Sequence, residues 1–258
     1  MKHHSQIVFR KFFLVLIICI FSVAAKAQED QYKKAMSLKA EFKYKDALPL
    51  FQELLKSDSS NIDYLQYSSQ VYTRYGYLYM PTTKEKQNYF HIGEYLARKA
   101  LAKDDNSAQA HFALCLALGR INENAGNKQK IANAKLIKTE IDKTILLDPK
   151  IANAYHILGR WNTTIASFSS GEKRAINLLY GGVPSGASFE EGIKAYQTAI
   201  ALDPKNMLHY YEIAQTYLKM KNKAESKTWL AKAMALPVVS DDDKLIIEQC
   251  KTLKAKLD

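Results

Sequence analysis

Two arginines at matching places in the sequence are well suited to binding a negatively charged ligand. Arg120 ends the tripeptide Leu118-Gly119-Arg120, and Arg160 ends a second copy of it, followed by Trp161 and Asn162. An arginine guanidinium is a planar fork of N–H donors that fits a carboxylate or a phosphate. Arg120, Arg160, Trp161 and Asn162 are therefore candidate ligand-binding residues. We expect Arg160, Trp161 and Asn162 to end a helix. The structural alternative, which is the commoner one, is therefore that each arginine satisfies the last carbonyls of its helix and that Trp161 is a packing anchor.

Tyrosines crowd one short segment of the chain, namely Tyr64, Tyr67, Tyr72, Tyr75, Tyr77 and Tyr79. On a single helix, successive residues are rotated by about 100 degrees, so these side chains cannot all point into a core. Some of them must be exposed or line a binding face, and Tyr64 and Tyr67 are the candidates for that role. Ordinary packing is an equal alternative, because tyrosine serves both uses well.

No pattern in the sequence indicates catalysis, a metal or a cofactor. His111 and His156 lack a third ligand at metal spacing, so packing is the better interpretation. The glycine-rich stretch 181–186 lacks the Gly-Lys-Ser/Thr ending of a phosphate loop and follows no strand, which favours a helix-connecting turn. Nucleophile-elbow, metalloprotease and paired-carboxylate motifs are also missing. We therefore predict a protein that is not an enzyme, with no catalytic residue, metal or cofactor.

The elements that position these residues are predicted by two similar helix junctions. Leu147-Asp148-Pro149 and Leu202-Asp203-Pro204 each follow a helix-like run, and an aromatic residue, Tyr155 or Tyr210, comes seven residues after the Asp. Proline cannot continue a helix but suits the start of the next one. A recurring junction of this kind is typical of stacked helical hairpins.

Residues 210–237 form the clearest single unit of such a stack. Its pattern resembles a tetratricopeptide repeat, with small residues where two antiparallel helices approach closely; the marking positions are Tyr210, Ile213, Ala214, Tyr217, Ser226, Leu230, Ala233 and Pro237. A weaker copy covers residues 35–61. We predict an all-α fold, a right-handed α-α superhelix of tetratricopeptide-like hairpins, four or so units long.

Some units depart from the usual repeat length. Asp104, Asp148 and Asp203 are 44 and 55 residues apart, against about 34 in the standard repeat. The additional residues fall in a polar connection at 122–130, before an extended helix through Leu147, and in the stretch 169–186. Helix starts are predicted by the capping-box pairs Thr82 with Glu85, Ser169 with Glu172, and Ser188 with Glu191. Acidic residues at 241–243 predict a final helix over about 240–257 that caps the stack.

The first 27 residues are predicted to be an export signal. A basic start, an apolar run from Phe12 to Ala25 and a small-x-small pattern at 25–27 fit a cleaved leader. The alternative is an uncleaved anchor, which would leave the protein associated with a membrane. The mature chain, 28–258, is then a single repeat domain with no second apolar run of spanning length. We expect a bacterial-type export to the periplasm.

The distribution of charge bears on nucleic-acid binding, and the two cysteines of the mature chain bear on whether it holds a disulfide. The formal net charge of the whole chain is +11, and residues 1–27 carry four basic and no acidic side chains, so the mature chain is at +7. The basic residues are interspersed with acidic ones, whereas a nucleic-acid-binding surface needs them clustered. We therefore expect no nucleic-acid partner. Cys115 and Cys250 can form a bridge, but buried free thiols are the favoured interpretation.

The off-length units are similar to those of the regulator of microtubule dynamics family. The resemblance covers roughly residues 85–250 and rests on the stretches 141–149, 154–162, 179–184 and 188–192, in which Leu-Gly-Arg-Trp-Asn and Gly-Gly-Val-Pro are its most specific parts. It implies a tetratricopeptide fold. It also implies roles described for animal members, at microtubules or organelle contact sites, and phospholipid binding by one member. We expect the fold to transfer to this chain and the microtubule role not to, because an exported bacterial protein meets no microtubule.

The fold and the candidate residues together predict a non-enzymatic interaction scaffold in the cell envelope. A protein or peptide partner would lie in the concave groove of the superhelix, with Arg120 and Arg160 acting together as an anion clamp. A lipid-binding or lipid-shuttling module, with phospholipid as the ligand, is the alternative. A lipid carrier needs a continuous apolar cavity, whereas a scaffold needs only a face of mixed polarity.

Overall fold

The computed structural model describes residues 25–182 and 184–257, and in this part of the chain every regular element is a helix. The first helix includes residues 25–40. The others are α2 (Tyr44–Ser57), α3 (Ile62–Tyr79), α4 (Thr83–Leu101), α5 (Ala108–Asn122), α6 (Asn127–Leu147), α7 (Ala152–Ala166), α8 (Ser170–Tyr180), α9 (Phe189–Leu202), α10 (Met207–Lys219), α11 (Lys223–Met234) and α12 (Asp241–Leu257). The all-α prediction is confirmed. Residues 1–24 of the predicted export signal lie outside the described residues.

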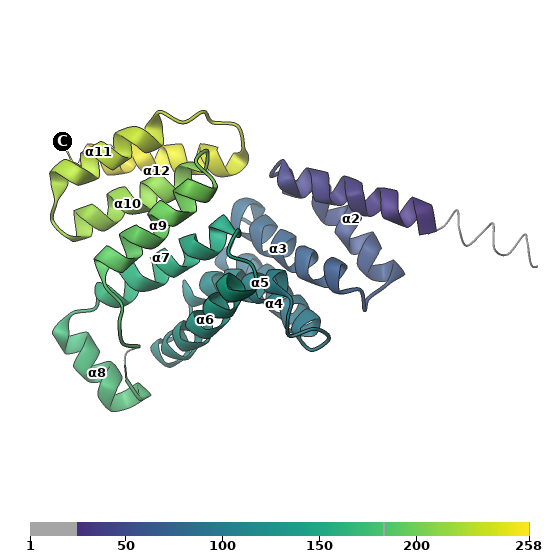
Figure 1. Cartoon of the computed structure of the whole chain (residues 1–258), viewed down its shortest axis with the longest axis horizontal. Helices are drawn as coiled ribbons and strands as arrows, with labels where there is room; N and C mark the ends of the chain where they lie inside the picture. Colours follow the sequence, from purple (N-terminus) through teal and green to yellow (C-terminus); the bar gives the residue numbers. More distant parts are fainter. Residues whose placement is uncertain (1–24, 183, 258) are drawn as a thin grey trace, which may run out of the picture.

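The helices pair in sequence order into antiparallel hairpins that stack into a superhelix (Figure 1). Helix 25–40 pairs with α2, α3 with α4, α5 with α6, α7 with α9, and α10 with α11. The described part of the chain thus holds five hairpins, in line with the expected four or so, and α12 packs on α10 and α11 at the end of the stack. The first helices of successive hairpins, α3, α5, α7 and α10, contact one another. We call the surface that they form the inner face.

The Asp-Pro junctions end helices as predicted, but Pro149 and Pro204 lie in the turns and do not open the next helices, which begin at Ala152 and Met207. α6 ends at Leu147 with Asp148 as its C-cap, and α9 ends at Leu202 with Asp203 as its C-cap. The Asp148 carboxylate accepts a hydrogen bond from the Lys150 backbone N–H at 3.0 Å, which satisfies a donor in the turn before α7. Complete capping boxes begin α4 at Thr82 and α8 at Ser169. At α9 the structure shows only half of the expected box, in which Ser188 accepts from the Glu191 backbone.

The extra residues of the off-length units form regular structure. The stretch after residue 122 becomes a short turn and the 21-residue helix α6. The stretch 169–186 contains α8, which comes between α7 and α9 in the sequence. In space α8 lies to one side of the stack, while α7 packs directly on α9 (Figure 1). Gly181 ends α8 with a φ of 70°, a left-handed conformation that glycine adopts without steric cost.

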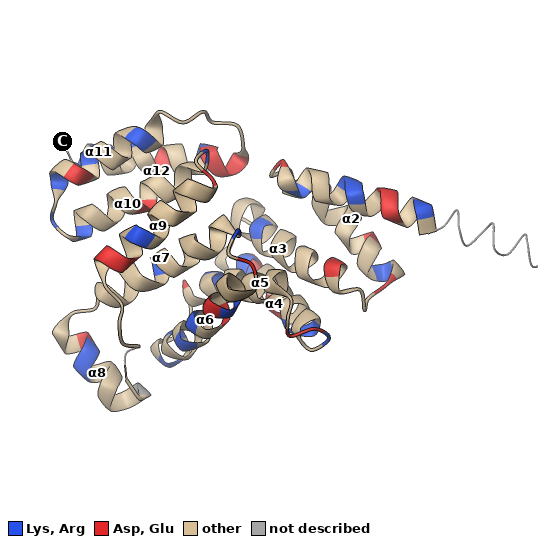
Figure 2. Cartoon of the chain, viewed as in Figure 1, with Lys and Arg blue, Asp and Glu red and all other residues tan. Residues whose placement is uncertain are grey.

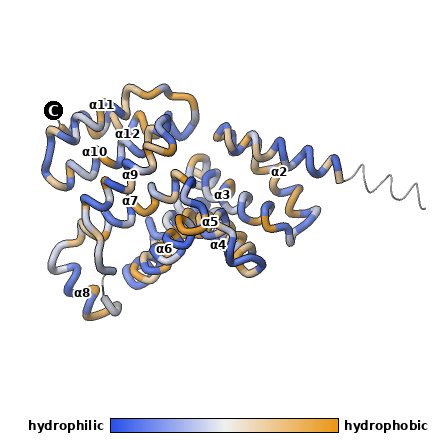
Figure 3. Tube along the Cα trace, in the orientation of Figure 1, coloured by the Kyte–Doolittle hydropathy of each residue, from blue (hydrophilic) through white to orange (hydrophobic). Residues whose placement is uncertain are grey.

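Each helix buries one side, so the core runs along the stack as consecutive clusters rather than as a single centre. Figure 3 shows hydrophobic and hydrophilic positions interleaved along the helices, as amphipathic packing requires. Trp161 belongs to the cluster shared by α5, α6 and α7, and its indole N–H donates to the Ala134 carbonyl at 2.8 Å. Cys115 and Cys250 are buried free thiols in different clusters. Among the helices of the described residues, none combines the length and the apolar character needed to cross a bilayer.

Candidate functional site

Three arginines from successive hairpins lie near one another on the inner face. Arg74 is on α3, Arg120 on α5 and Arg160 on α7. Arg74 follows the first residue of α3 by twelve positions, and Arg120 follows the first residue of α5 by the same interval. Stacked repeats place corresponding residues on the same face. We call Arg74, Arg120 and Arg160 the arginine row.

Tyr77 of α3 joins the first two members of the row. The guanidinium carbon of Arg120 lies 3.5 Å from the centroid of the Tyr77 ring, and that of Arg74 lies 5.8 Å from it. Arg74 also lies 5.8 Å from the ring of Tyr44 at the start of α2. An aromatic face attracts a cation through its quadrupole, so the tyrosine rings help to hold two positive charges close together.

Each arginine of the row has one carboxylate partner. The pairs are Arg74 with Asp242 of α12, Arg120 with Glu123 at 2.6 Å, and Arg160 Nε with Glu212 Oε1 of α10 at 3.8 Å. The side chains of Arg74 and Arg120 are only 16% and 10% exposed, whereas that of Arg160 is 44% exposed. Arg160 is therefore the accessible member of the row, and its ion pair is the loosest.

The pKa values of Arg120 and Arg74 are set by burial and by these ion pairs. Burial holds the pKa of Arg120 below the usual arginine value; Glu123 opposes this effect, while the positive charges of Arg160 and Arg74 add to it. Burial acts in the same direction at Arg74, but the Asp242 carboxylate outweighs it and raises the pKa. Arginine stays protonated at neutral pH. The row thus holds three fixed positive charges, each paired with one carboxylate, and its guanidinium groups suit carboxylate or phosphate ligands.

Two expectations about the arginines need correction. Arg160 does not close its helix, because α7 continues to Ala166. Neither Arg120 nor Arg160 has the local helix carbonyls as its described partners; their ion pairs are with carboxylates, and that of Arg160 comes from another hairpin. The side chains are therefore not simple helix caps, and both belong to one electrostatic cluster on the inner face.

The other candidate residues lie in packed surroundings. Trp161 is 6% exposed against α6, and Asn162, also 6% exposed, donates to the Leu158 carbonyl at 3.0 Å. Tyr64 is 7% exposed and its ring centroid lies 5.4 Å from that of Tyr32 in the first helix. Tyr67 lies beneath the ammonium group of Lys39 at 5.1 Å. Tyr77 is the tyrosine of the crowded segment that meets the arginine row.

Two histidines next to the row are buried against each other. The Nδ1 atoms of His156 on α7 and His209 on α10 are 3.0 Å apart. Burial lowers the pKa of His209 to about 4, and burial together with His209 and the arginines holds that of His156 well below its usual value. Both rings are therefore neutral at physiological pH, and one donates its Nδ1 proton to the other.

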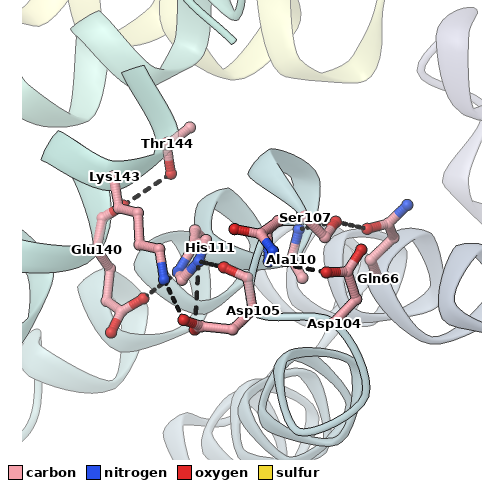
Figure 4. Close-up of polar contacts among 10 residues, drawn as sticks. Gln66, Asp104, Asp105, Ser107, Ala110, His111, Glu140, Lys143 and Thr144 are labelled. Carbon is pink, nitrogen blue, oxygen red and sulfur yellow. Dashed lines mark hydrogen bonds and ion pairs between the residues drawn. The ribbon is translucent and has the colours of Figure 1, made fainter. Parts of the chain in front are cut away.

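His111 lies in a separate polar network between α5 and α6 (Figure 4). Its Nδ1 meets the Glu140 carboxylate and its Nε2 lies 2.9 Å from the Asp105 carbonyl oxygen, while Lys143 pairs with the Asp105 carboxylate. These contacts tie the turn before α5 to α6. Within residues 25–182 and 184–257, no three His, Cys, Asp or Glu side chains are grouped as metal ligands would be. The network therefore stabilises the hairpin formed by α5 and α6.

The start of α12 reaches the arginine row from the other end of the chain. Asp242 pairs with Arg74, and the Tyr79 hydroxyl donates to Asp241 Oδ2 at 2.8 Å. Figure 2 shows this acidic first turn directed toward the N-terminal helices. A hollow of about 420 Å³ is lined by α10 and by the body of α12, with Tyr211 and Gln215 in its wall. The inner face therefore offers the arginine row, and α10 and α12 offer a hollow of mixed polarity at the end of the stack.

Sequence reasoning missed Arg74, Glu212 and Asp242. The signal for Arg74 was its matching interval from the helix start, which becomes visible only once the starts of α3 and α5 are known. Nothing local marks Glu212 or Asp242 as partners of arginines. Asp242 is 168 residues from Arg74 in the sequence, and only the stacking of the hairpins brings them together.

Comparisons with known proteins agree with this architecture. Residues 27–258 match the family model described as regulator of microtubule dynamics protein 1-3. Regulator of microtubule dynamics protein 1 of Bos taurus is 35% identical over 170 residues, covering 64% of this chain and 52% of that protein. Protein 3 of Xenopus laevis is 30% identical over 162 residues, covering 62% of this chain and 35% of that protein. The chain thus spans about half the length, or less, of these relatives.

A solved structure shows the same fold at low sequence identity. A thermophilic TPR protein of Thermus thermophilus superposes with a TM-score of 0.62 at 14% identity, covering 87% of this chain and 99% of that one. At such low identity the likeness concerns the fold alone. The family match extends beyond the segment 85–250 on which the resemblance was first based. By its matching residues and its repeat architecture, the chain belongs to the regulator of microtubule dynamics protein 1-3 family.

Proposed function

We propose that this chain is a non-enzymatic scaffold that binds an acidic segment of a partner protein along the inner face. The observation that carries the proposal is the arginine row, in which three guanidinium groups from successive hairpins lie close enough to influence one another. Like charges held together repel, so their juxtaposition favours a site that carboxylates occupy. Arg160 is the entry point, since nearly half of its side chain is exposed and Glu212 is 3.8 Å away.

The charge of the inner face supports a protein partner over an acyl chain. Burying a hydrocarbon chain requires a continuous apolar lining, whereas this face carries three arginines together with Glu123 and Glu212. A peptide with alternating acidic and apolar side chains suits both the row and the hollow beside α12. Phospholipid, the other candidate ligand, is an outcome that the experiments below distinguish.

Replacing Arg160 tests the binding site directly. For Arg160→Gln we expect a fluorescent hexaglutamate peptide to bind about tenfold more weakly than to the wild type, a loss of about 1.4 kcal/mol. The melting temperature should change little, because a loose and partly exposed ion pair contributes about 1 kcal/mol at most. Arg174→Gln on the exposed surface of α8 is the matched control, since it removes the same charge away from the row. Equal weakening by both variants would show a general charge effect and no site.

Native mass spectrometry of the protein purified from its own host identifies the class of ligand. We expect a co-purified protein or peptide whose retention decreases in Arg160→Gln. Co-purified phospholipid with the same dependence on Arg160 would replace the scaffold by a lipid-binding module.

We further propose that residues 1–27 direct export and that the mature domain, 28–258, acts in the periplasm. The support is the basic start, the apolar run and the small-x-small pattern in the sequence. Intact-mass measurement of the protein from the periplasmic fraction should give a chain that begins at Gln28. A mass that includes Met1 would indicate a retained anchor or no export.

A further inference from the structure

The first turn of α12 brings two of its three acidic residues to the inner face. Asp243 is used for capping: its carboxylate accepts from the Ser240 backbone N–H at 3.0 Å, and its own N–H donates to the Ser240 hydroxyl at 3.1 Å. Asp241 and Asp242 are not needed for that purpose. They meet Arg74 and Tyr79 of α3 instead, and so connect the last helix to the second hairpin.

The contact between Asp242 and Arg74 leaves bonding capacity unused. Both side chains are 16% exposed, and Asp242 Oδ2 is buried without a hydrogen-bond partner among the described residues. A buried carboxylate oxygen with no donor costs free energy. A buried ion pair of this kind gives little net stabilisation, because desolvation offsets the attraction. Another carboxylate that engages the guanidinium through both oxygens would therefore compete well for Arg74.

The first turn of α12 contacts α3 through the polar side chains of Asp241 and Asp242, whereas the rest of the helix is held by apolar packing. The body of the helix packs Ile246, Cys250 and Leu253 into a core cluster with α10 and α11. The segment before it is exposed, with Val238 and Val239 at 45% and 77%. The first turn can therefore move while the rest of the helix stays in place.

We propose that the acidic first turn of α12 is a built-in occupant of Arg74, which an acidic segment of a partner replaces when it binds along the arginine row. The inference rests on the proposed function, since it assumes that this partner binds there. Arg74 is then part of the binding site, and in the free protein the Asp242 carboxylate occupies the Arg74 guanidinium. The partner is identified by its chemistry: a peptide segment with successive carboxylates.

The test compares hexaglutamate binding to full-length variants at low salt, with hexaglutamine as the uncharged peptide. Asp242→Asn should bind hexaglutamate about tenfold more tightly than the wild type, because the competing carboxylate is gone while Arg74 remains. Glu53→Gln is the matched control: it removes the same charge from α2, at a side chain that is 58% exposed and lies outside both the row and the hollow. Adding Arg74→Gln to Asp242→Asn should abolish the gain. Hexaglutamate binding that is no tighter for Asp242→Asn than for Glu53→Gln would overturn the proposal.

A second variant keeps the test decisive if Asp242→Asn does not fold. Tyr79→Phe removes the hydrogen bond to Asp241 without changing charge, and should tighten hexaglutamate binding about threefold while amide exchange in residues 241–244 speeds up. Unchanged exchange and binding in Tyr79→Phe would then overturn the proposal. Failure of the proposed function is seen separately, as hexaglutamate binding that does not depend on Arg160 in any background.

Discussion

His156 and His209 show how burial, aided at His156 by nearby positive charges, can make folding sensitive to pH. Their rings lie together in the core beside the arginine row, and their pKa values are held below the ordinary histidine value. Above a pH of about 6.5 these rings are neutral in both the folded and the unfolded chain. Below it, the unfolded chain binds protons that the folded chain excludes, so acidification favours unfolding.

We therefore expect the free energy of unfolding to fall as the pH decreases from about 6.5 toward about 4, where His209 begins to titrate in the folded state. The slope is at most about 1.4 kcal/mol per pH unit for each histidine. Urea unfolding at pH 7.5, 6 and 5 measures it. His209→Leu should reduce the slope in this interval, while His91→Gln, which changes an exposed histidine on α4, should retain it. An unchanged slope in His209→Leu would show that other groups cause the acid sensitivity.

Helices α7 and α9 pack closely because glycines face large side chains. A Cβ added to Gly159 would lie 2.5 Å from Cε1 of the fully buried Tyr196 ring, and one added to Gly192 would lie 2.4 Å from the Thr163 methyl carbon. Gly119, in the other copy of the Leu-Gly-Arg tripeptide, has no such neighbour within 4 Å. The glycine of the tripeptide thus allows a close helix contact in one hairpin and meets no neighbour in the other.

Alanine at the two positions should have opposite effects. Gly159→Ala is expected to lower the free energy of unfolding by about 2 kcal/mol, because a buried aromatic ring must move. Gly119→Ala is expected to raise it by up to about 1 kcal/mol, because alanine favours the helix more than glycine. Chemical denaturation of both variants measures the difference. Equal effects would contradict the close approach of α7 and α9.

Sequence patterns predicted most helix boundaries, but not the end of α7. Junctions at Asp148 and Asp203 and the boxes at Thr82 and Ser169 are local hydrogen-bonding patterns, so they could be read from neighbouring residues. The extension of α7 to Ala166 was missed, since its end has no glycine or proline to mark it. The binding role of Arg120 and Arg160 remains a prediction. The structure adds that they share a cluster with Arg74.

A stack of hairpins distributes its stability along the chain, because each hairpin packs mainly on its neighbours. Phe51 is fully buried in the cluster around helix 25–40, α2 and α3. Leu230 is 2% exposed in the cluster around α10, α11 and α12. These two clusters share no residue, so damage to one should remain largely local.

Hydrogen exchange of Phe51→Ala and Leu230→Ala measures this independence. Large-to-small changes of this kind cost about 2 to 5 kcal/mol. Phe51→Ala should weaken amide protection in α2 and α3 more than in α10 and α11, and Leu230→Ala should do the reverse. Uniform loss of protection in both variants would show that the superhelix opens as one unit, with the contact between α12 and α3 as the obvious link.

The amino-acid sequence was sufficient to determine that this chain is a stack of helical hairpins with off-length units. Helix periodicity, Asp-Pro junctions and capping residues act between near neighbours, and their physical meaning does not depend on the rest of the molecule. Only the tertiary structure decided which side chains meet across hairpins. It placed Gly159 against a neighbouring helix and left Gly119 without a close neighbour. It also paired Arg160 with Glu212 and brought Asp242 to Arg74, which is 168 residues away in the sequence. Such contacts depend on the rotation and spacing of every intervening helix, because small packing differences accumulate along the stack.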